Sequence, residues 1–343
     1  MYADRRPGFR LALGAVAMAV VVVVLGAFTR LADAGLGCPD WPGCYGFVGI
    51  PMAEDAIGRA ELRFPDAPYE FDKAWPEMVH RYFAAALGLL ILVIAALAVR
   101  RRGVPDQPLK LPVALLLMVM LQGAFGAWTV TLKLWPQVVT AHLLGGFTTL
   151  SLLWLLSLRL GWRVPAIGGV ERDRLRAVVP FALVALVVLI MQIALGGWTS
   201  SNYAALACPD FPTCQGAWLP DTDFRHGFDV LQEVGPSYLG GLMYGEGRVA
   251  IHFTHRIGAI IATLALALLA WRLLAQSAEH RLGRFAAVLI GVLAVQLSLG
   301  IGNVVFSLPL WMATAHNAVG AALLLVVVSV NYRLLAATRT PGA

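Results

Sequence analysis

Residues 11–29, LALGAVAMAVVVVVLGAFT, indicate the fold class of this chain. The stretch contains no charged residue, and a helix that spans a bilayer needs about 20 consecutive apolar residues. Six later stretches of similar length are also uncharged, and one more, 249–271, is interrupted only by Arg256 and two histidines. The sequence therefore predicts an all-α membrane protein with eight transmembrane helices. The seven later stretches are 82–99, 111–132, 134–158, 177–199, 249–271, 285–310 and 311–332.

Composition supports this class. Of the 343 residues, 59% are hydrophobic and 13% are charged, whereas soluble chains carry about 25% charged residues. The mean hydropathy is +0.74. These values exclude a soluble enzyme, and they also exclude a disordered chain, which needs low hydrophobicity and high net charge.

The net charge of +6 follows the predicted topology. If the N-terminus is cytoplasmic, 17 of the 26 Lys and Arg residues face the cytoplasm, including Arg5, Arg6, Arg163 and the run 100–102. This positive-inside pattern predicts that both termini are cytoplasmic. The basic balance then indicates contact with the lipid bilayer rather than with nucleic acid.

The first apolar stretch has a second interpretation as a signal peptide. Its length exceeds the usual signal core of about 7–15 residues, and a copy of it recurs in mid-chain, so we favour a membrane span. Because no transit peptide is recognisable, we expect a bacterial inner membrane rather than a mitochondrial one.

Three groups of residues recur in the same order, which predicts a tandem repeat. The halves should be parallel four-helix bundles, 1–165 and 166–343, related by a pseudo-two-fold axis along the membrane normal. The paired landmarks are Gly26…Cys38-Pro-Asp-Trp-Pro-Gly-Cys44 with Gly196…Cys208-Pro-Asp-Phe-Pro-Thr-Cys214, His80-Arg81 with His255-Arg256, and Gln122…His142 with Gln296…His316.

Four histidines should lie at one depth near the outer ends of alternate helices, and they are His80, His142, His255 and His316. An ionisable residue inside a membrane helix indicates function by default. Two facing imidazoles suit a haem iron, whose other positions a porphyrin fills, better than zinc, which takes four tetrahedral ligands. The alternative is that these histidines have only a structural role and fill space between the helices.

Residues around these histidines add to the haem hypothesis. Gly88, Gly145, Gly146 and Gly320 follow the histidines and would leave room for a flat ligand, although ordinary helix packing explains them equally well. Arg81 and Arg256 each follow a histidine directly. Each arginine could pair with a haem propionate or extend to lipid headgroups.

The two halves differ one turn before a histidine. Glu77 precedes His80 by three positions, and His252 precedes His255 by three positions, so each shares a helix face with its histidine. A carboxylate beside one site and an imidazole beside the other suggest that one site does chemistry while the other holds a permanent cofactor. The alternative for Glu77 is a helix cap, because Pro76 is typical of a first helical turn.

Together these motifs resemble the haem A synthase family over nearly the whole chain. The segments that carry the resemblance are Gly35-Leu-Gly-Cys38-Pro-Asp-Trp-Pro-Gly-Cys44, Glu77-Met-Val-His80-Arg81 and Phe253-Thr-His255-Arg256. The resemblance implies an enzyme that hydroxylates the C8 methyl of haem O twice, giving a gem-diol that loses water to form the formyl group of haem A.

The resemblance also implies roles for individual residues. His255 and His316 would ligate a resident haem b, His80 and His142 would bind the haem O substrate, and Glu77 would be the catalytic carboxylate. A haem O synthase, an oxidase assembly factor and an electron donor are the implied partners. Two other functions stay open: a di-haem cytochrome b that takes electrons from quinol, and a haem carrier.

Cys38, Cys44, Cys208 and Cys214 are the four cysteines of the chain. Four cysteines allow three disulfide connectivities. Because each pair lies in its own repeat copy on the oxidising side, we expect the local bridges Cys38–Cys44 and Cys208–Cys214. We favour a structural role for the second bridge, and for the first we leave a structural and a redox role open.

Overall fold

The computed structural model describes residues 6–162, 164, 167, 169–232, 235, 237–276 and 282–339. In this part of the chain the regular structure is helical, and two isolated β-bridges, Cys44 to Phe47 and Cys214 to Ala217, are its only β pairings. Arg5 and Arg163 of the topology argument and the predicted boundary between residues 165 and 166 lie outside the described residues.

Eight helices in the described ranges are long and apolar enough to cross a membrane, as predicted. The shorter helices are α2 (Glu54–Arg63), α6 (Gly169–Arg176) and α8 (Phe224–Gly227). The long helices are α1 (Phe9–Leu31), α3 (Phe71–Arg100), α4 (Lys110–Thr131), α5 (Pro136–Gly161), α7 (Val179–Ser201), α9 (Gly245–Ala275), α11 (Leu282–Val305) and α12 (Leu310–Ala337).

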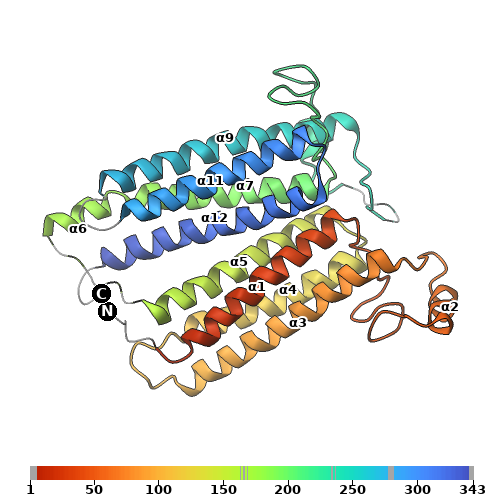
Figure 1. Ribbon diagram of the computed structural model, residues 1–343, viewed down its shortest axis with the longest axis horizontal. Coiled ribbons are helices and arrows are strands. Elements are labelled where there is room, and N and C mark those ends of the chain that lie inside the picture. The colour runs from red at the N-terminus through yellow and green to blue at the C-terminus, as the bar shows by residue number, and fades with distance from the viewer. Residues whose placement is uncertain are drawn as a thin grey trace.

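The long helices form two groups (Figure 1). In the first group α1 packs on α3, α3 on α4, α4 on α5, and α5 back on α1, which closes a ring of four. In the second group α7, α9, α11 and α12 close a ring in the same way. Helices α1 and α5 of the first group also contact α12, and α5 contacts α7. The two-fold axis that would relate the groups stays a prediction.

Small residues allow the central helices to approach closely. Ala12 and Ala15 of α1 and Ala182 and Ala185 of α7 are fully buried, as expected where helices associate in lipid. Large apolar side chains such as Leu117 of α4 are instead exposed on the outer faces. In water such exposure would be costly, but on a membrane-spanning helix it is the surface that lipid covers.

Polar contacts join the groups at both ends. Arg30 of α1 donates from Nη2 to the Ser200 carbonyl at 2.6 Å, and its guanidinium lies 4.1 Å from the centroid of the Tyr203 ring. At the other end of the bundle the Trp154 indole donates to the Ser329 hydroxyl at 2.7 Å. These contacts hold the two groups in register.

Helix α3 starts earlier than the uncharged run 82–99 suggests. It begins at Phe71, so Pro76 and Glu77 lie inside the helix and not at its first turn. The cap interpretation of Glu77 is therefore wrong. The first turns of α3 carry charge because they project beyond the apolar part of the helix and pack against the loop before it, where Met78 joins a buried cluster with Tyr45 and Ala60.

Candidate functional site

The helix rings place the four histidines in two facing pairs. His80 lies on α3 and His142 on α5, which are diagonal in the first ring. His255 lies on α9 and His316 on α12, which are diagonal in the second ring. Side chains from diagonal helices can meet only across the interior of a four-helix bundle, where such folds build their cofactor sites.

The first pair has a spacing that suits a shared metal ion. The ring centroids of His80 and His142 are 6.5 Å apart, with the ring planes at 87°. A metal held between two imidazole nitrogens at about 2 Å each places the centroids roughly 6 to 6.5 Å apart. The Nδ1 atoms of both rings are buried and have no hydrogen-bond partner among the described residues.

In the second pair each histidine contacts a glutamine. Gln192 of α7 places its Nε2 at 3.1 Å from His255 Nδ1 and donates to the His255 carbonyl at 3.0 Å. Gln296 of α11 places its Nε2 at 3.2 Å from His316 Nε2. Sequence reasoning used Gln296 only as a repeat landmark and did not mention Gln192. Glutamines inside predicted spans were the signal that could have revealed this role.

A glycine of a neighbouring helix faces each histidine ring. A Cβ added to Gly26 would lie 2.8 Å from His80 Cε1, and one added to Gly300 would lie 3.0 Å from His316 Cε1. The equivalent distances are 3.4 Å from Gly126 to His142 and 3.3 Å from Gly196 to His255. A side chain would clash with the imidazole at Gly26 and crowd it at Gly300, whereas Gly196 and Gly126 leave slightly more space.

The glycines expected from sequence have different neighbours. A Cβ on Gly145 would meet Gln122, one on Gly320 would meet Gln296, one on Gly88 would meet Val119, and one on Gly146 would meet nothing within 4 Å. Room for a flat ligand at these four glycines stays a prediction, whereas the glycines that face the imidazoles lie on the neighbouring helices. The offset of 170 between Gly26 and Gly196 was the available signal.

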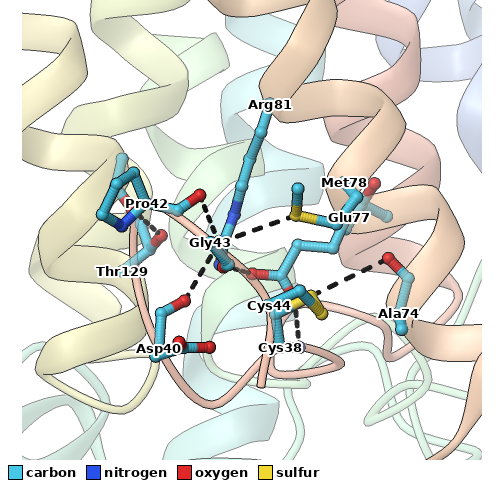
Figure 2. A network of polar contacts seen from close by, with 12 residues as sticks. Cys38, Asp40, Pro42, Gly43, Cys44, Ala74, Glu77, Met78, Arg81 and Thr129 are labelled. Atoms are coloured by element: carbon cyan, nitrogen blue, oxygen red, sulfur yellow. Dashed lines mark hydrogen bonds and ion pairs between the residues drawn. A yellow bond between two sulfur atoms is a disulfide. The ribbon is translucent and has the colours of Figure 1, made fainter. Parts of the chain in front are cut away.

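Glu77 and Arg81 fasten the first cysteine loop to α3 (Figure 2). The Cys38 amide donates to Glu77 Oε2 at 2.9 Å, and Arg81 Nη2 donates to Glu77 Oε1 at 2.5 Å. Arg81 Nη1 also donates to the carbonyls of Asp40 at 3.0 Å and Gly43 at 2.5 Å. Glu77 is 5% exposed, so a largely buried ion pair with Arg81 attaches the loop to α3, one turn from His80.

The second half repeats this arrangement with different chemistry. The Cys208 amide donates to His252 Nδ1 at 3.2 Å, and Arg256 Nε lies 3.3 Å from His252 Nε2. Arg256 also donates to the carbonyls of Thr213 and Cys208, both at 2.8 Å. An imidazole therefore replaces the carboxylate of Glu77 at the same structural position.

Both expected disulfides are present. Cys38 and Cys44 are bonded, as are Cys208 and Cys214, and all four are buried. An aspartate in each loop closes the turn: Gly46 donates to Asp40, and Gly216 donates to Asp210. The Thr213 hydroxyl, with the Gly216 and Gln215 amides, holds the pKa of Asp210 below its ordinary value. Each loop is thus a closed unit attached to a histidine-bearing helix.

Comparison with known proteins identifies the family of this chain. Residues 9–328 match the family model described as "Cytochrome oxidase assembly protein". The chain is 48% identical to haem A synthase of Shewanella oneidensis over 92% of this chain and 93% of the relative.

The chain belongs to the haem A synthase family. More distant relatives support the same membership. Haem A synthases of Sphingopyxis alaskensis and of a Caulobacter species are each 28% identical and cover 94% of this chain. The matched regions make up 90% and 94% of the lengths of these two relatives, respectively.

In this haem A synthase family member the structure brings together most of the residues expected from sequence. His80 and His142 form one pair, and Glu77, one turn before His80, and Arg81, directly after it, contact the first cysteine loop. Arg256 lies beneath the second loop. The described residues contain no group of three or more His, Cys, Asp or Glu that could hold a metal ion.

Proposed function

We propose that this chain is a haem A synthase, an integral membrane enzyme that oxidises the C8 methyl of haem O to the formyl group of haem A. The observation that carries the proposal is the pair of imidazoles facing each other across a four-helix ring, combined with 48% identity to a relative named haem A synthase. The methyl carbon is hydroxylated twice, and the resulting gem-diol loses water.

We assign the substrate site to the first half. His80 and His142 would hold haem O at its iron, which fixes the porphyrin between α3 and α5. The side chains one turn outward of His80 would then lie near the porphyrin edge. Glu77 is the one carboxylate in that position, and the Cys38–Cys44 loop above it would exclude water from the methyl group.

We assign a resident haem b to His255 and His316. The residues fit such a group: His316 Nδ1 is buried without a partner among the described residues, and Gly196 and Gly300 leave space beside the rings. A haem bound there supplies a redox centre within the membrane. Gln192 and Gln296 would orient the two imidazoles, as the outer partners of metal-bound histidines do. Direct contact of Arg81 and Arg256 with haem propionates stays a prediction.

For Glu77 we propose a second role beyond anchoring the loop. A carboxylate held by Arg81 and the Cys38 amide is fixed in position and can accept a proton released during methyl oxidation. In the resident-haem half, where no such transfer is needed, His252 occupies the position instead.

The substitution Glu77→Gln tests this role. We expect conversion of haem O to fall about 100-fold, which is the usual contribution of a positioned acid or base. The absorption spectrum of the resident haem should be unchanged. Haem A yield in membranes, measured by extraction and chromatography, is the readout.

The matched control is Arg81→Gln, which breaks the same ion pair but keeps the carboxylate. A smaller loss in Arg81→Gln than in Glu77→Gln supports proton transfer. Equal losses would leave Glu77 with the anchoring role alone. Haem A yields at the wild-type level in Glu77→Gln would refute both roles.

The overall function is tested by the mass of the haem extracted from cells that make this protein and are supplied with haem O. We expect haem O carrying a hydroxymethyl or formyl group in place of the C8 methyl. Unaltered haem with rapid reduction by quinol would instead indicate a di-haem cytochrome b. Unaltered haem without redox activity would indicate a carrier.

We further propose that the protein lies in a bacterial inner membrane with both termini cytoplasmic, on the arginine distribution described above. A haem O synthase, an oxidase assembly factor and an electron donor are the proposed partners. Reporter fusions after Arg102 and Arg174 should be active on the cytoplasmic side, and fusions at Asp66 and Asp229 on the periplasmic side. A periplasmic reading at Arg174 would contradict the parallel arrangement of the halves.

A further inference from the structure

A basic cavity lies at the end of the bundle where α1 begins and α12 ends. Its volume is about 580 Å³, within the range of ligand sites. It is lined by the segment before α1, the connection from α3 to α4, and the last turns of α5 and α12. On α5 it begins at Arg159, which is roughly 25 Å along the helix from His142 at 1.5 Å per residue. The cavity is therefore separate from the haem sites.

The charges around this cavity are unbalanced. Arg6, Arg159 and Arg339 line it together with one carboxylate, Asp106. Asp106 is already engaged, because Arg6 donates from Nη1 to its carbonyl at 2.6 Å and has Nη2 at 3.6 Å from its Oδ2. Within the described part of the chain the side chains of Arg159 and Arg339 form no hydrogen bond or ion pair and are exposed. Two uncompensated guanidinium groups in one cavity favour an anion between them.

The walls of the cavity suit lipid. Trp162, at the end of α5, is 47% exposed, and the Tyr332 hydroxyl of α12 donates to its carbonyl at 3.1 Å. Tryptophan and tyrosine are enriched where membrane helices reach the headgroup layer. Val164 and Ala336 also line the cavity and add apolar surface beside these aromatic side chains. The cavity thus combines a cationic floor with an aromatic and apolar edge at headgroup depth.

We propose that this cavity binds the phosphodiester headgroup of an anionic phospholipid. Arg159 comes from the first helix ring and Arg339 follows the last helix of the second, so one phosphate between them would join the two groups. Basic cavities between membrane helices bind anionic lipid headgroups in this way. A zwitterionic headgroup carries the same phosphate, but its ammonium group would face arginines and bind more weakly.

The test measures binding of phosphatidylglycerol to the delipidated full-length protein by native mass spectrometry, with phosphatidylcholine and inorganic phosphate as separate probes. For the double variant Arg159→Gln/Arg339→Gln we expect phosphatidylglycerol binding to fall about 25-fold, which corresponds to roughly five-fold for each arginine near a lipid surface. The control is Arg100→Gln/Arg102→Gln, which removes two arginines at the end of α3 that do not line this cavity. Its binding should fall clearly less than that of the first double variant, because neither residue would contact the bound phosphate.

Equal loss in both double variants would overturn the proposal, because it would indicate general attraction to a basic surface. Inorganic phosphate that binds as tightly as phosphatidylglycerol would overturn the lipid assignment. A photoactivatable phosphatidylglycerol tests the wild type without any substitution. Crosslinks should map to the peptides that contain Trp162 and Tyr332, and crosslinks confined to other helices would refute the site.

Discussion

The variant His255→Ala is expected to lose the resident haem. Two imidazoles on diagonal helices are proposed to hold this haem, and alanine leaves its iron with one protein ligand. Loss of an outer partner alone weakens metal sites by about 10- to 100-fold, so loss of a ligand should weaken retention by at least roughly 100-fold. The reduced-minus-oxidised absorption spectrum and the ratio of haem to protein after purification measure this directly.

Two further variants make the result specific. His226→Ala changes an exposed histidine of the short helix α8, outside both rings, and should retain full haem content. His255→Met keeps a side chain that can ligate haem iron, so it should retain haem with a shifted spectrum even if the alanine variant folds poorly. A full, unshifted haem spectrum in both His255 variants would contradict the assignment of this site.

The variants His80→Ala and His142→Ala are expected to abolish conversion of haem O and to leave the resident haem spectrum intact. Their imidazoles would fix the substrate, and misplacement by about 1 Å can cost roughly 100-fold in rate. We therefore expect haem A yield to fall by at least about 100-fold. Haem extraction from membranes and a spectrum of the purified protein should be measured on the same preparation.

The second measurement distinguishes the two halves. If the substitution at His80 or His142 erased the resident haem while His255→Ala kept it, the assignments of the two sites would be reversed. Normal haem A yield from either alanine variant would exclude these histidines as substrate ligands. The neighbouring glycine offers a finer test, because Gly26→Ala places a methyl group against the His80 ring and should impair conversion with little effect on the resident haem.

Much of the fold was predictable because lipid imposes a simple rule on sequence. Seven uncharged stretches and one interrupted by Arg256 predict the eight helices, and their charged flanks mark most of the ends. The start of α3 was missed because four of the residues 71–81 are charged, which ends the apolar run. Charged side chains here pair with the preceding loop or with each other. The Lys73–Glu70 pair at 2.8 Å is one example. The length of an uncharged stretch carries no information about such pairs between a helix end and a loop.

The candidate site was predictable where it depends on position along a helix and not where it depends on the loops. Equal depth and repetition identified the four histidines. The partners of Arg81 are backbone carbonyls of the loop at Asp40 and Gly43, and a backbone carbonyl leaves no mark in a sequence. The geometry of Glu77 was likewise hidden, because its partner is the amide of Cys38.

The exchange of Glu77 for His252 has a consequence for how such a protein can be altered. If two copies of a four-helix chain had associated as separate subunits, each substitution would occur on both sides at once. Because both copies lie in one chain, a substitution can occur in one half without the other. On the proposed assignment, one half can then carry out the reaction while the other holds a permanent haem. An engineer could therefore exchange Glu77 and His252, singly or together, and learn how far one position determines the division of labour.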